Sequence, residues 1–152
     1  MAANEGNLEI VRILLKAGAA VHIGSSTPLE LATGNGLTEV VNLLLEASNY
    51  SGRQKNTKFD DAWFLAICGG HIDIVRSLIA VGADVNRLWS RGSGLHYAIE
   101  RGQKAIGQLL LASGASVDIR DPDKSGSEWT PRDASRQSSK WRNCRDVDCG
   151  WG

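Results

Sequence analysis

The sequence predicts an all-α solenoid built from stacked helix-turn-helix units. The first observation is a unit that recurs four times, once in about 30 to 34 residues, and a fixed period of this length is typical of repeat proteins. The second is the content of the unit: an apolar run with helical periodicity, then Gly-Ala-x-Val or a variant of it, then a polar turn. Since one unit is too small to bury its own apolar face, neighbouring units must stack and share a core.

Four apolar runs mark the second helix of each unit. In register they are residues 8–15, 38–45, 72–79 and 104–111. An acidic residue lies in the first turn of the first three runs (Glu9, Glu39 and Asp73), where the helix dipole favours negative charge. In the fourth run Gly107 stands where the others carry valine. We expect it to cost on the order of 1 kcal/mol in helix propensity and to leave a packing gap.

Glycines separate the predicted helices, because glycine tolerates the left-handed conformation that closes a helix. One set marks the turn between the two helices of each unit: Gly6, Gly36, Gly70 and Gly102. A second set, Gly18, Gly82 and Gly114, ends the second helix, and Ser48 holds that place in the second unit. In the third unit these glycines predict a first helix over residues 62–68 and a second over residues 71–81.

Composition and charge favour a single soluble domain without nucleic-acid or membrane contacts. The chain has 152 residues, and 17 Lys and Arg balance 17 Asp and Glu, so no basic surface for phosphates is indicated. No apolar stretch approaches the roughly 20 residues that cross a bilayer, and the N-terminus lacks a basic stretch followed by an apolar one. Three cysteines form no disulfide framework. We therefore expect a cytoplasmic or nuclear monomer.

No set of residues predicts catalysis, a cofactor or a metal. His22, His71 and His96 fall at three different places in the unit, and none has a Ser or Cys and an acid at a spacing that suits nucleophilic catalysis. Cys144 and Cys149 have no second cysteine pair and no histidine nearby, so a zinc ligand set is missing. We expect that the chain is not an enzyme.

Three motifs carry a resemblance to a known family. They are Thr-Pro-Leu-Glu-Leu-Ala-Thr-Gly-Asn-Gly at residues 27–36, Gly-Leu-His-Tyr-Ala-Ile-Glu-Arg-Gly at residues 94–102, and Gly-Ala-Asp-Val-Asn at residues 82–86. They resemble the ankyrin repeat family, whose signature begins Thr-Pro-Leu-His-x-Ala-Ala and ends Gly-Ala-Asp-Val-Asn. The resemblance covers residues 1–119 and implies an ankyrin-repeat solenoid with short β-hairpin or finger loops. It also implies that His96 hydrogen-bonds backbone between repeats.

The resemblance divides the chain into an array and a C-terminal segment. We expect repeats over about residues 1–22, 23–56, 57–88 and 89–119. Met1 then falls inside the first helix of the first repeat, so apolar surface should be exposed there, either because the chain is a fragment or because the first repeat frays. Residues 120–152 are expected to hold an extended finger, a partial fifth repeat (129–136) and a disordered tail. The finger is a binding element or a linker.

In the resemblance, partners contact the two residues before each turn glycine and the finger residues. Carried over, the candidate partner-binding residues are Asn4, Glu5, Asn35, Lys58, Trp89, Ser90, Glu100, Arg101 and Trp129. We favour the patch of Trp89, Glu100 and Arg101, since tryptophan and arginine carry much of the energy of interfaces. The alternative is that Trp89 and Trp129 fold back over adjacent helices. Trp63 replaces a leucine of the first helix and is expected in the core.

The predicted function is a protein-protein interaction module that binds another protein through a concave groove and finger loops, without catalysis. The alternative is a targeting or regulatory segment of a larger enzyme or channel. The resemblance also makes Asn86 a candidate for hydroxylation by intracellular hydroxylases. A structural role for Asn86, bridging the hairpin, is the competing interpretation.

Overall fold

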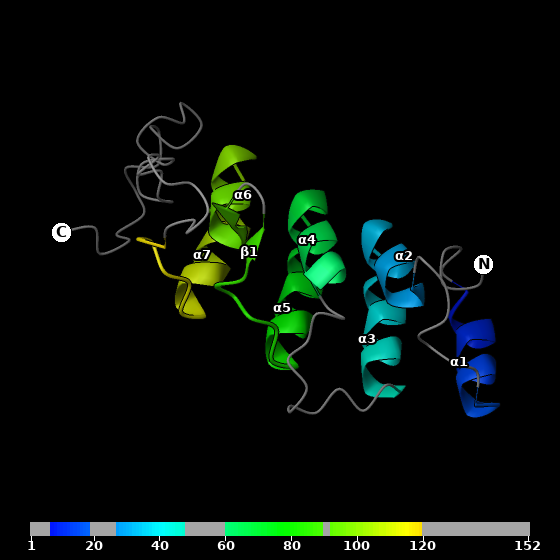
Figure 1. The fold of residues 1–152 in the computed structure, drawn as a ribbon. Coiled ribbons are helices and arrows are strands. Elements are labelled where there is room, and N and C mark those ends of the chain that lie inside the picture. Colours follow the sequence, from blue (N-terminus) through cyan, green and yellow to red (C-terminus); the bar gives the residue numbers. More distant parts are fainter. Residues whose placement is uncertain (1–6, 19–26, 48–59, 90–91, 120–152) are drawn as a thin grey trace. The chain divides into compact units, whose positions relative to one another are not determined.

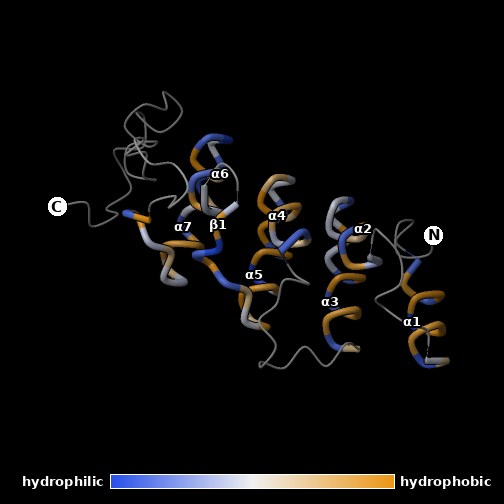
Figure 2. The backbone as a smooth tube through the Cα atoms, in the orientation of Figure 1, coloured by the Kyte–Doolittle hydropathy of each residue, from blue (hydrophilic) through white to orange (hydrophobic). Residues whose placement is uncertain are grey.

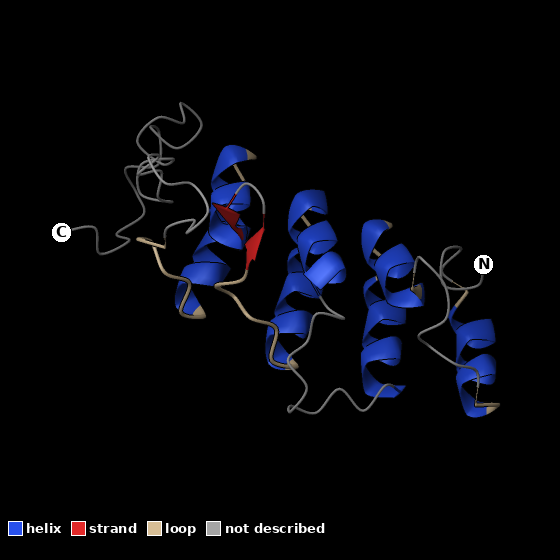
Figure 3. Cartoon of the chain, in the orientation of Figure 1, coloured by secondary structure: helices blue, strands red, loops and turns tan. Residues whose placement is uncertain are grey.

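The computed structural model describes residues 7–18, 27–47, 60–89 and 92–119, and its contacts divide the chain into two units. Unit 1 is Met1–Asp84 and unit 2 is Val85–Gly152. Within the described residues the regular structure is helical, apart from one short hairpin (Figure 3). The all-α fold class is therefore confirmed. None of the helices in these ranges is long and apolar enough to cross a membrane.

The described residues of unit 1 form one helix followed by two helix pairs. Its elements are α1 (Leu8–Lys16), α2 (Pro28–Gly34), α3 (Thr38–Ala47), α4 (Asp60–Gly69) and α5 (Ile72–Ala80). The first helices, α2 and α4, contact each other, and the second helices α1, α3 and α5 contact one another in that order (Figure 1). Within unit 1, equivalent helices of successive repeats thus pack on each other, as the period of the sequence predicts.

Unit 2 contains a hairpin and one helix pair. Its elements are β1 (Leu88–Trp89), β2 (Gly92–Ser93), α6 (Gly94–Glu100) and α7 (Lys104–Ala112). The strands are antiparallel, with Leu88 opposite Ser93 and Trp89 opposite Gly92. The helices α6 and α7 pack together, and β2 contacts α6. The finger expected from the resemblance is confirmed here as a two-stranded hairpin.

The second helices begin where the apolar runs begin, and each extends one or two residues beyond its run. The bounds predicted from the glycines of the third unit are close: α4 extends beyond residues 62–68 at both ends, and α5 is one residue shorter at each end than residues 71–81. Their starts follow local chemistry: the side chain of Asn7 accepts the backbone N–H of Ile10 at 3.2 Å and caps α1. A first helix is capped in the same way. Thr27 and Glu30 form a capping box at α2, with Pro28 at its first position.

The core is built from the apolar faces of these helices. The largest fully buried side chains in unit 1 are Trp63, Ile67, Ile74, Leu78, Val40, Val41, Val75 and Thr33; those in unit 2 are Leu95, Ile99 and Leu110. Trp63 is 1% exposed, so its expected core position is confirmed. Gly107 is buried in α7, and the packing gap beside it stays a prediction.

The turn glycines adopt the predicted left-handed conformation. Gly36, Gly70 and Gly102 have φ of 69°, 76° and 68°; Gly18, Gly82 and Gly114, after the second helices, have φ of 77°, 94° and 90°. Gly6 and Ser48 lie outside the described residues, as do residues 120–152 with the partial fifth repeat. The division into four repeats and a C-terminal segment stays a prediction.

The His71 ring joins two successive turns of unit 1. His71 is the N-cap of α5, and its ring lies so close to Gly36 that a Cβ there would be 2.7 Å from Cε1. The same ring lies against Gly69, where a Cβ would overlap Nε2. Both positions therefore need glycine, because any side chain would collide with the imidazole unless it moved.

We expect Gly36→Ala to lower the free energy of unfolding by about 2 kcal/mol, since it combines a positive φ with a collision. Chemical denaturation followed by circular dichroism measures this change. Gly82→Ala is the matched control, because Gly82 has a positive φ and no atom within 4 Å of its added Cβ. Equal losses in the two variants would show that the His71 contact contributes nothing beyond backbone strain.

Candidate functional site

The turn glycines place the first helices in a common register. Five residues before each glycine stand Leu31, Leu65 and Tyr97, and one residue before it stand Asn35, Gly69 and Arg101. Residues four apart lie on the same side of a helix, so each of these pairs shares one face. Unit 1 contains four of these residues (Leu31, Asn35, Leu65 and Gly69) and unit 2 contains two (Tyr97 and Arg101); we call each set the first-helix face of its unit.

In unit 1 the first-helix face has an exposed apolar side chain. Leu31 is 37% exposed, and Leu65 on the neighbouring helix is half-buried. Asn35 follows α2 as its C-cap, is exposed, and donates its backbone N–H to the carbonyl of Leu31 at 3.2 Å. Because α2 and α4 contact each other, Leu31 and Leu65 belong to one surface of unit 1.

In unit 2 two aromatic rings meet. Trp89 on β1 packs edge-to-face on Tyr97 of α6, with ring centroids 6.3 Å apart and planes at 81°. Tyr97 is only 7% exposed, whereas Trp89 is half-buried. This geometry places Trp89 over its own helix pair, as the fold-back alternative expects, and still leaves part of the indole at the surface. Edge-to-face pairs of this kind add about 0.5–1.5 kcal/mol beyond burial.

A buried histidine supports the hairpin that carries Trp89. His96 is 2% exposed, and its Nδ1 accepts the backbone N–H of Ser93 at 3.0 Å and lies 3.0 Å from the Ser93 hydroxyl. This assigns the ring proton to Nε2. Gly92, opposite Trp89, has φ 121°, and a Cβ there would be 2.7 Å from Cγ of His96. The position of Trp89 thus depends on the residues at the start of α6.

Glu100 and Arg101 end the same helix. Glu100 is the last residue of α6 and Arg101 is its C-cap; both side chains are exposed. The backbone N–H of Arg101 donates to the carbonyl of Tyr97 at 3.1 Å, which fixes the start of its side chain one turn from Tyr97. The structure therefore places Trp89, Tyr97 and Arg101 on one side of α6. Glu100 precedes Arg101 directly, so its side chain leaves the helix about 100° away from that of Arg101.

Five of the predicted site residues, Asn4, Glu5, Lys58, Ser90 and Trp129, lie outside the described residues. Three residues of the first-helix faces, Leu31, Leu65 and Tyr97, were not predicted as site residues. The signal was present in the sequence, because each stands four residues before the residue that precedes a turn glycine (Asn35, Gly69 and Arg101). In the sequence alone, however, all three resemble ordinary members of an apolar helix.

The Asn86 side chain joins two turns of unit 2. Its Nδ2 donates to the carbonyl of Gly114 at 3.1 Å, and its Oδ1 accepts the backbone N–H of Ser116 at 2.7 Å. Both ends of the amide are therefore engaged by a turn about 30 residues further along the chain. This is the bridging role expected as the alternative to modification; hydroxylation of Asn86 stays a prediction.

The two described histidines have local structural roles. His71 packs on two glycines, and His96 binds the backbone at the start of α6. Among the residues that the structure describes, no group of three His, Cys, Asp or Glu side chains could hold a metal ion. His22, Cys144 and Cys149 lie outside them. The surface described above can bind by shape, apolar contact and charge.

Comparisons with known proteins agree with the repeat register. A family model described as ankyrin repeats (3 copies) matches residues 1–58 and 51–121. The chain is 33% identical over 115 residues to the ankyrin repeat and KH domain-containing protein mask of Drosophila melanogaster, and 32% identical over 133 residues to the transient receptor potential cation channel subfamily A member 1 of the same fly. It is 43% identical over 68 residues to the fly E3 ubiquitin-protein ligase Ufd4.

These matches are local. They cover 73%, 79% and 45% of this chain, but only 3%, 11% and 2% of the three relatives, respectively. The chain therefore corresponds to a small part of each of these longer proteins.

We expect Asn86→Ala to lower the free energy of unfolding by about 1–3 kcal/mol, because two hydrogen bonds are lost and two backbone groups lose a partner. Asn86→Asp is the informative companion variant, since it keeps the acceptor for Ser116 N–H and places a carboxylate oxygen against the Gly114 carbonyl. Denaturant unfolding gives the free energies, and hydrogen exchange at Ser116 reports the bond directly. Unchanged exchange at Ser116 in Asn86→Ala would contradict the bridge.

Proposed function

Because this chain belongs to the ankyrin-repeat family, we propose that it binds a partner protein through the first-helix face of each unit, and in unit 2 through Tyr97 and Arg101 together with the neighbouring Trp89. Ankyrin repeats are protein-interaction modules, and the family model spans most of the chain. Which protein is bound depends on the residues of the face, since a fold alone does not specify a function.

The observation that carries this proposal is the packing of Trp89 on Tyr97 one helical turn from Arg101. The contact with Tyr97 restricts the indole before a partner arrives, so little side-chain entropy is lost on binding. The remaining exposed part of the ring offers apolar area, and a guanidinium offers a planar pair of donors to a carboxylate. We infer a partner segment with an acidic residue next to an apolar one.

Unit 1 supplies a second contact of the same kind. Its first-helix face presents exposed Leu31 beside the amide of Asn35, a combination suited to an apolar side chain and a backbone hydrogen bond. Binding through such positions needs no cofactor and no turnover. The partner is recognised by the side chains at fixed places in each repeat.

A second candidate is that this chain is the targeting or regulatory ankyrin segment of a larger enzyme or channel. The observation that favours it is the small share of each relative that the chain spans, together with a channel and a ubiquitin ligase among those relatives by name. Sequencing the full transcript tests this. An open reading frame that continues the repeats into another domain supports it, and an in-frame stop directly upstream of Met1 removes it.

We expect affinity capture from a cell lysate to retain a partner with the intact chain and to lose at least about nine tenths of it with Trp89→Ala or Arg101→Ala, because truncating such anchors costs about 2 kcal/mol or more. Quantitative mass spectrometry of the retained proteins measures this loss.

Lys104→Ala is the matched control, since Lys104 is an exposed cation of unit 2 on α7, away from the first-helix face. Arg101→Lys keeps the positive charge and removes the planar guanidinium, so we expect weaker capture of the partner. Circular dichroism must show equal helicity in all variants. If Arg101→Ala and Lys104→Ala reduce capture equally, the partner is held by positive charge in general and not by a site at Arg101, and the proposal fails.

A further inference from the structure

Asn35 is the one asparagine of this chain that precedes a glycine. An asparagine in that position is chemically labile, because the backbone nitrogen of the next residue can attack the side-chain carbonyl, and glycine has no side chain to obstruct the approach. The pair lies at the turn between α2 and α3, where Asn35 is the exposed C-cap of α2 and Gly36 has φ of 69°. The turns after α4 and α6 have Gly69 and Arg101 at the equivalent position, so neither can react in this way.

The reaction needs only the chain itself and water. The nitrogen of Gly36 loses its proton and bonds to Cγ of Asn35, the bond from Cγ to the side-chain nitrogen breaks, and that nitrogen takes up the proton and leaves as ammonia. The product is a five-membered succinimide ring. Water then opens the ring at one of its two carbonyls and gives either aspartate or isoaspartate, the latter with one extra methylene in the main chain. The net change replaces an amide by a carboxylate, with no oxidation or reduction.

The conformation of the turn opposes closure of this ring. Asn35 has ψ of 0°, so the nitrogen of Gly36 eclipses the backbone nitrogen of Asn35, whereas ring closure needs it to eclipse Cβ. The peptide between the two residues must therefore rotate. This rotation breaks two hydrogen bonds that close α2: Gly36 N–H donates to the carbonyl of Thr33 at 3.0 Å, and Leu37 N–H donates to that of Ala32 at 2.9 Å. Both accepting residues are 0% exposed, so the loss of these bonds is costly.

The His71 ring holds the same turn from the next helix pair. A Cβ on Gly36 would be 2.7 Å from Cε1 and 2.9 Å from Nδ1 of His71, so the ring leaves Gly36 little room to move towards it. His71 is the N-cap of α5, and its backbone N–H donates to the carbonyl of Ala66 at 3.0 Å. Helix α5 packs on α3, and both helices are apolar over most of their length (Figure 2). Rotation of the peptide at Gly36 thus requires that this ring move away.

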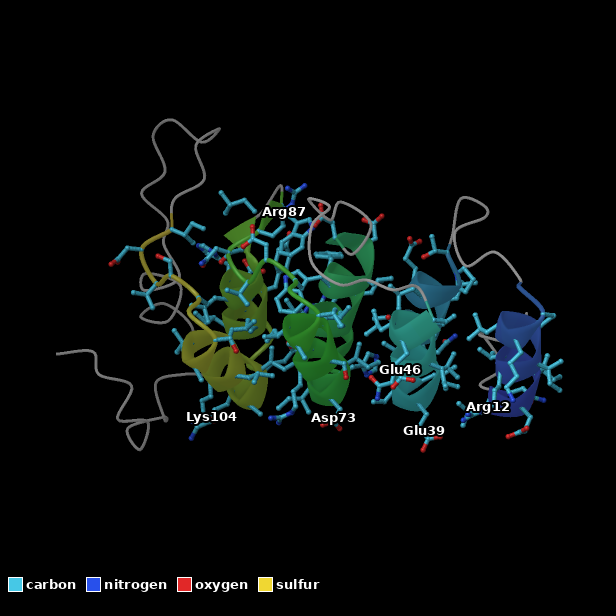
Figure 4. All side chains as sticks on the ribbon, turned by 90° about the horizontal axis from the view of Figure 1, so that it is seen from below. Arg12, Glu39, Glu46, Asp73, Arg87 and Lys104 are labelled. Carbon is cyan, nitrogen blue, oxygen red and sulfur yellow. The ribbon has the colours of Figure 1, made fainter. Side chains whose placement is uncertain are left out.

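Water has access to the turn, as the last step of the reaction needs. Asn35 is exposed, and Gly36 and Leu37 are half-buried. The first turns of α3 and α5 carry exposed carboxylates, Glu39 and Asp73, which lie on one side of unit 1 in Figure 4. The rate of the reaction is therefore limited by the conformation of the turn and not by the supply of water.

We propose that Asn35 is a deamidation site, and that the His71 ring keeps it unreactive in the folded chain. The reaction proceeds when the turn opens, and the lost ammonia makes it irreversible. The extent of deamidation at Asn35 is therefore a measure of how often this part of unit 1 has opened. The isoaspartate product has a longer main chain that does not fit the turn at Gly36, so α2 loses its C-cap. This inference goes beyond partner binding, because it concerns a covalent change in the chain itself.

Incubation of the full chain in mildly alkaline buffer, with and without urea at an unfolding concentration, tests the proposal. Tandem mass spectrometry of the proteolytic peptides locates the change in mass and distinguishes aspartate from isoaspartate. We expect deamidation at Asn35 to be at least about tenfold slower in the folded chain than in the unfolded chain, because ring closure waits for a local opening. Equal rates in the two states, or no deamidation in urea, overturn the proposal.

Two variants separate the His71 contact from stability in general. His71→Asn removes the ring and keeps a favoured N-cap residue for α5, and it should raise the rate in the folded chain at least about fivefold. Gly82→Ala is the matched control: it is strained at a positive φ, has no atom within 4 Å of its added Cβ, and should leave the rate unchanged. Hydrogen exchange at the Gly36 amide should become faster in His71→Asn alone. A rate in His71→Asn no higher than in the natural chain, or an equal rise in both variants, overturns the proposal.

Discussion

No described helix of this chain covers its own apolar side, and every other feature depends on that constraint. A helix of seven to ten residues is marginal in water, so it persists only when neighbours bury its apolar face. In unit 1 this burial is repeated from α1 to α3 to α5, where Val41 and Val75 are fully inaccessible at the same register position. In unit 2 the α6 and α7 pair follows the same rule with Leu95 and Leu110. In α1 this burial is incomplete, because Ile10, Ile13 and Leu14 are 45%, 61% and 45% exposed.

The sequence predicted the second helices, the turn glycines and the core position of Trp63 because these depend on local patterns. Apolar spacing specifies a helix face, and a glycine at a fixed place specifies a positive φ, whatever the rest of the chain does. The contact between Trp89 and Tyr97 could not be predicted in this way, since it depends on how a two-residue strand lies on the following helix. The role of His71 was hidden for the same reason, because its ring packs on Gly36 of the preceding turn. For His96 the resemblance implied a backbone hydrogen bond between repeats, and the bond described here is to Ser93 at the start of its own helix.

Some residues of the proposed binding surface also stabilise the fold, and Tyr97 is the clearest case. Tyr97 is nearly buried, yet it places Trp89 and begins the turn in which Arg101 leaves the helix. Exposed side chains at one position of the repeat can therefore differ from repeat to repeat, while the buried residues beneath them stay at the same positions of each helix. Leu31 and Tyr97 stand at the same position with different side chains and different exposure. Recognition in a repeat array is specified by such differences between equivalent positions.

The amide of Asn86 has a consequence for how the chain responds to a pulling force. Its two hydrogen bonds join turns that are about 30 residues apart, and they lie between backbone segments outside the helix pair. Under tension these bonds are loaded before the apolar faces of α6 and α7 are separated, since the turns connect the helices to the rest of the chain. The Asn86 bridge closes a loop that contains α6 and α7, so tension along the chain reaches this helix pair only after the two hydrogen bonds have broken.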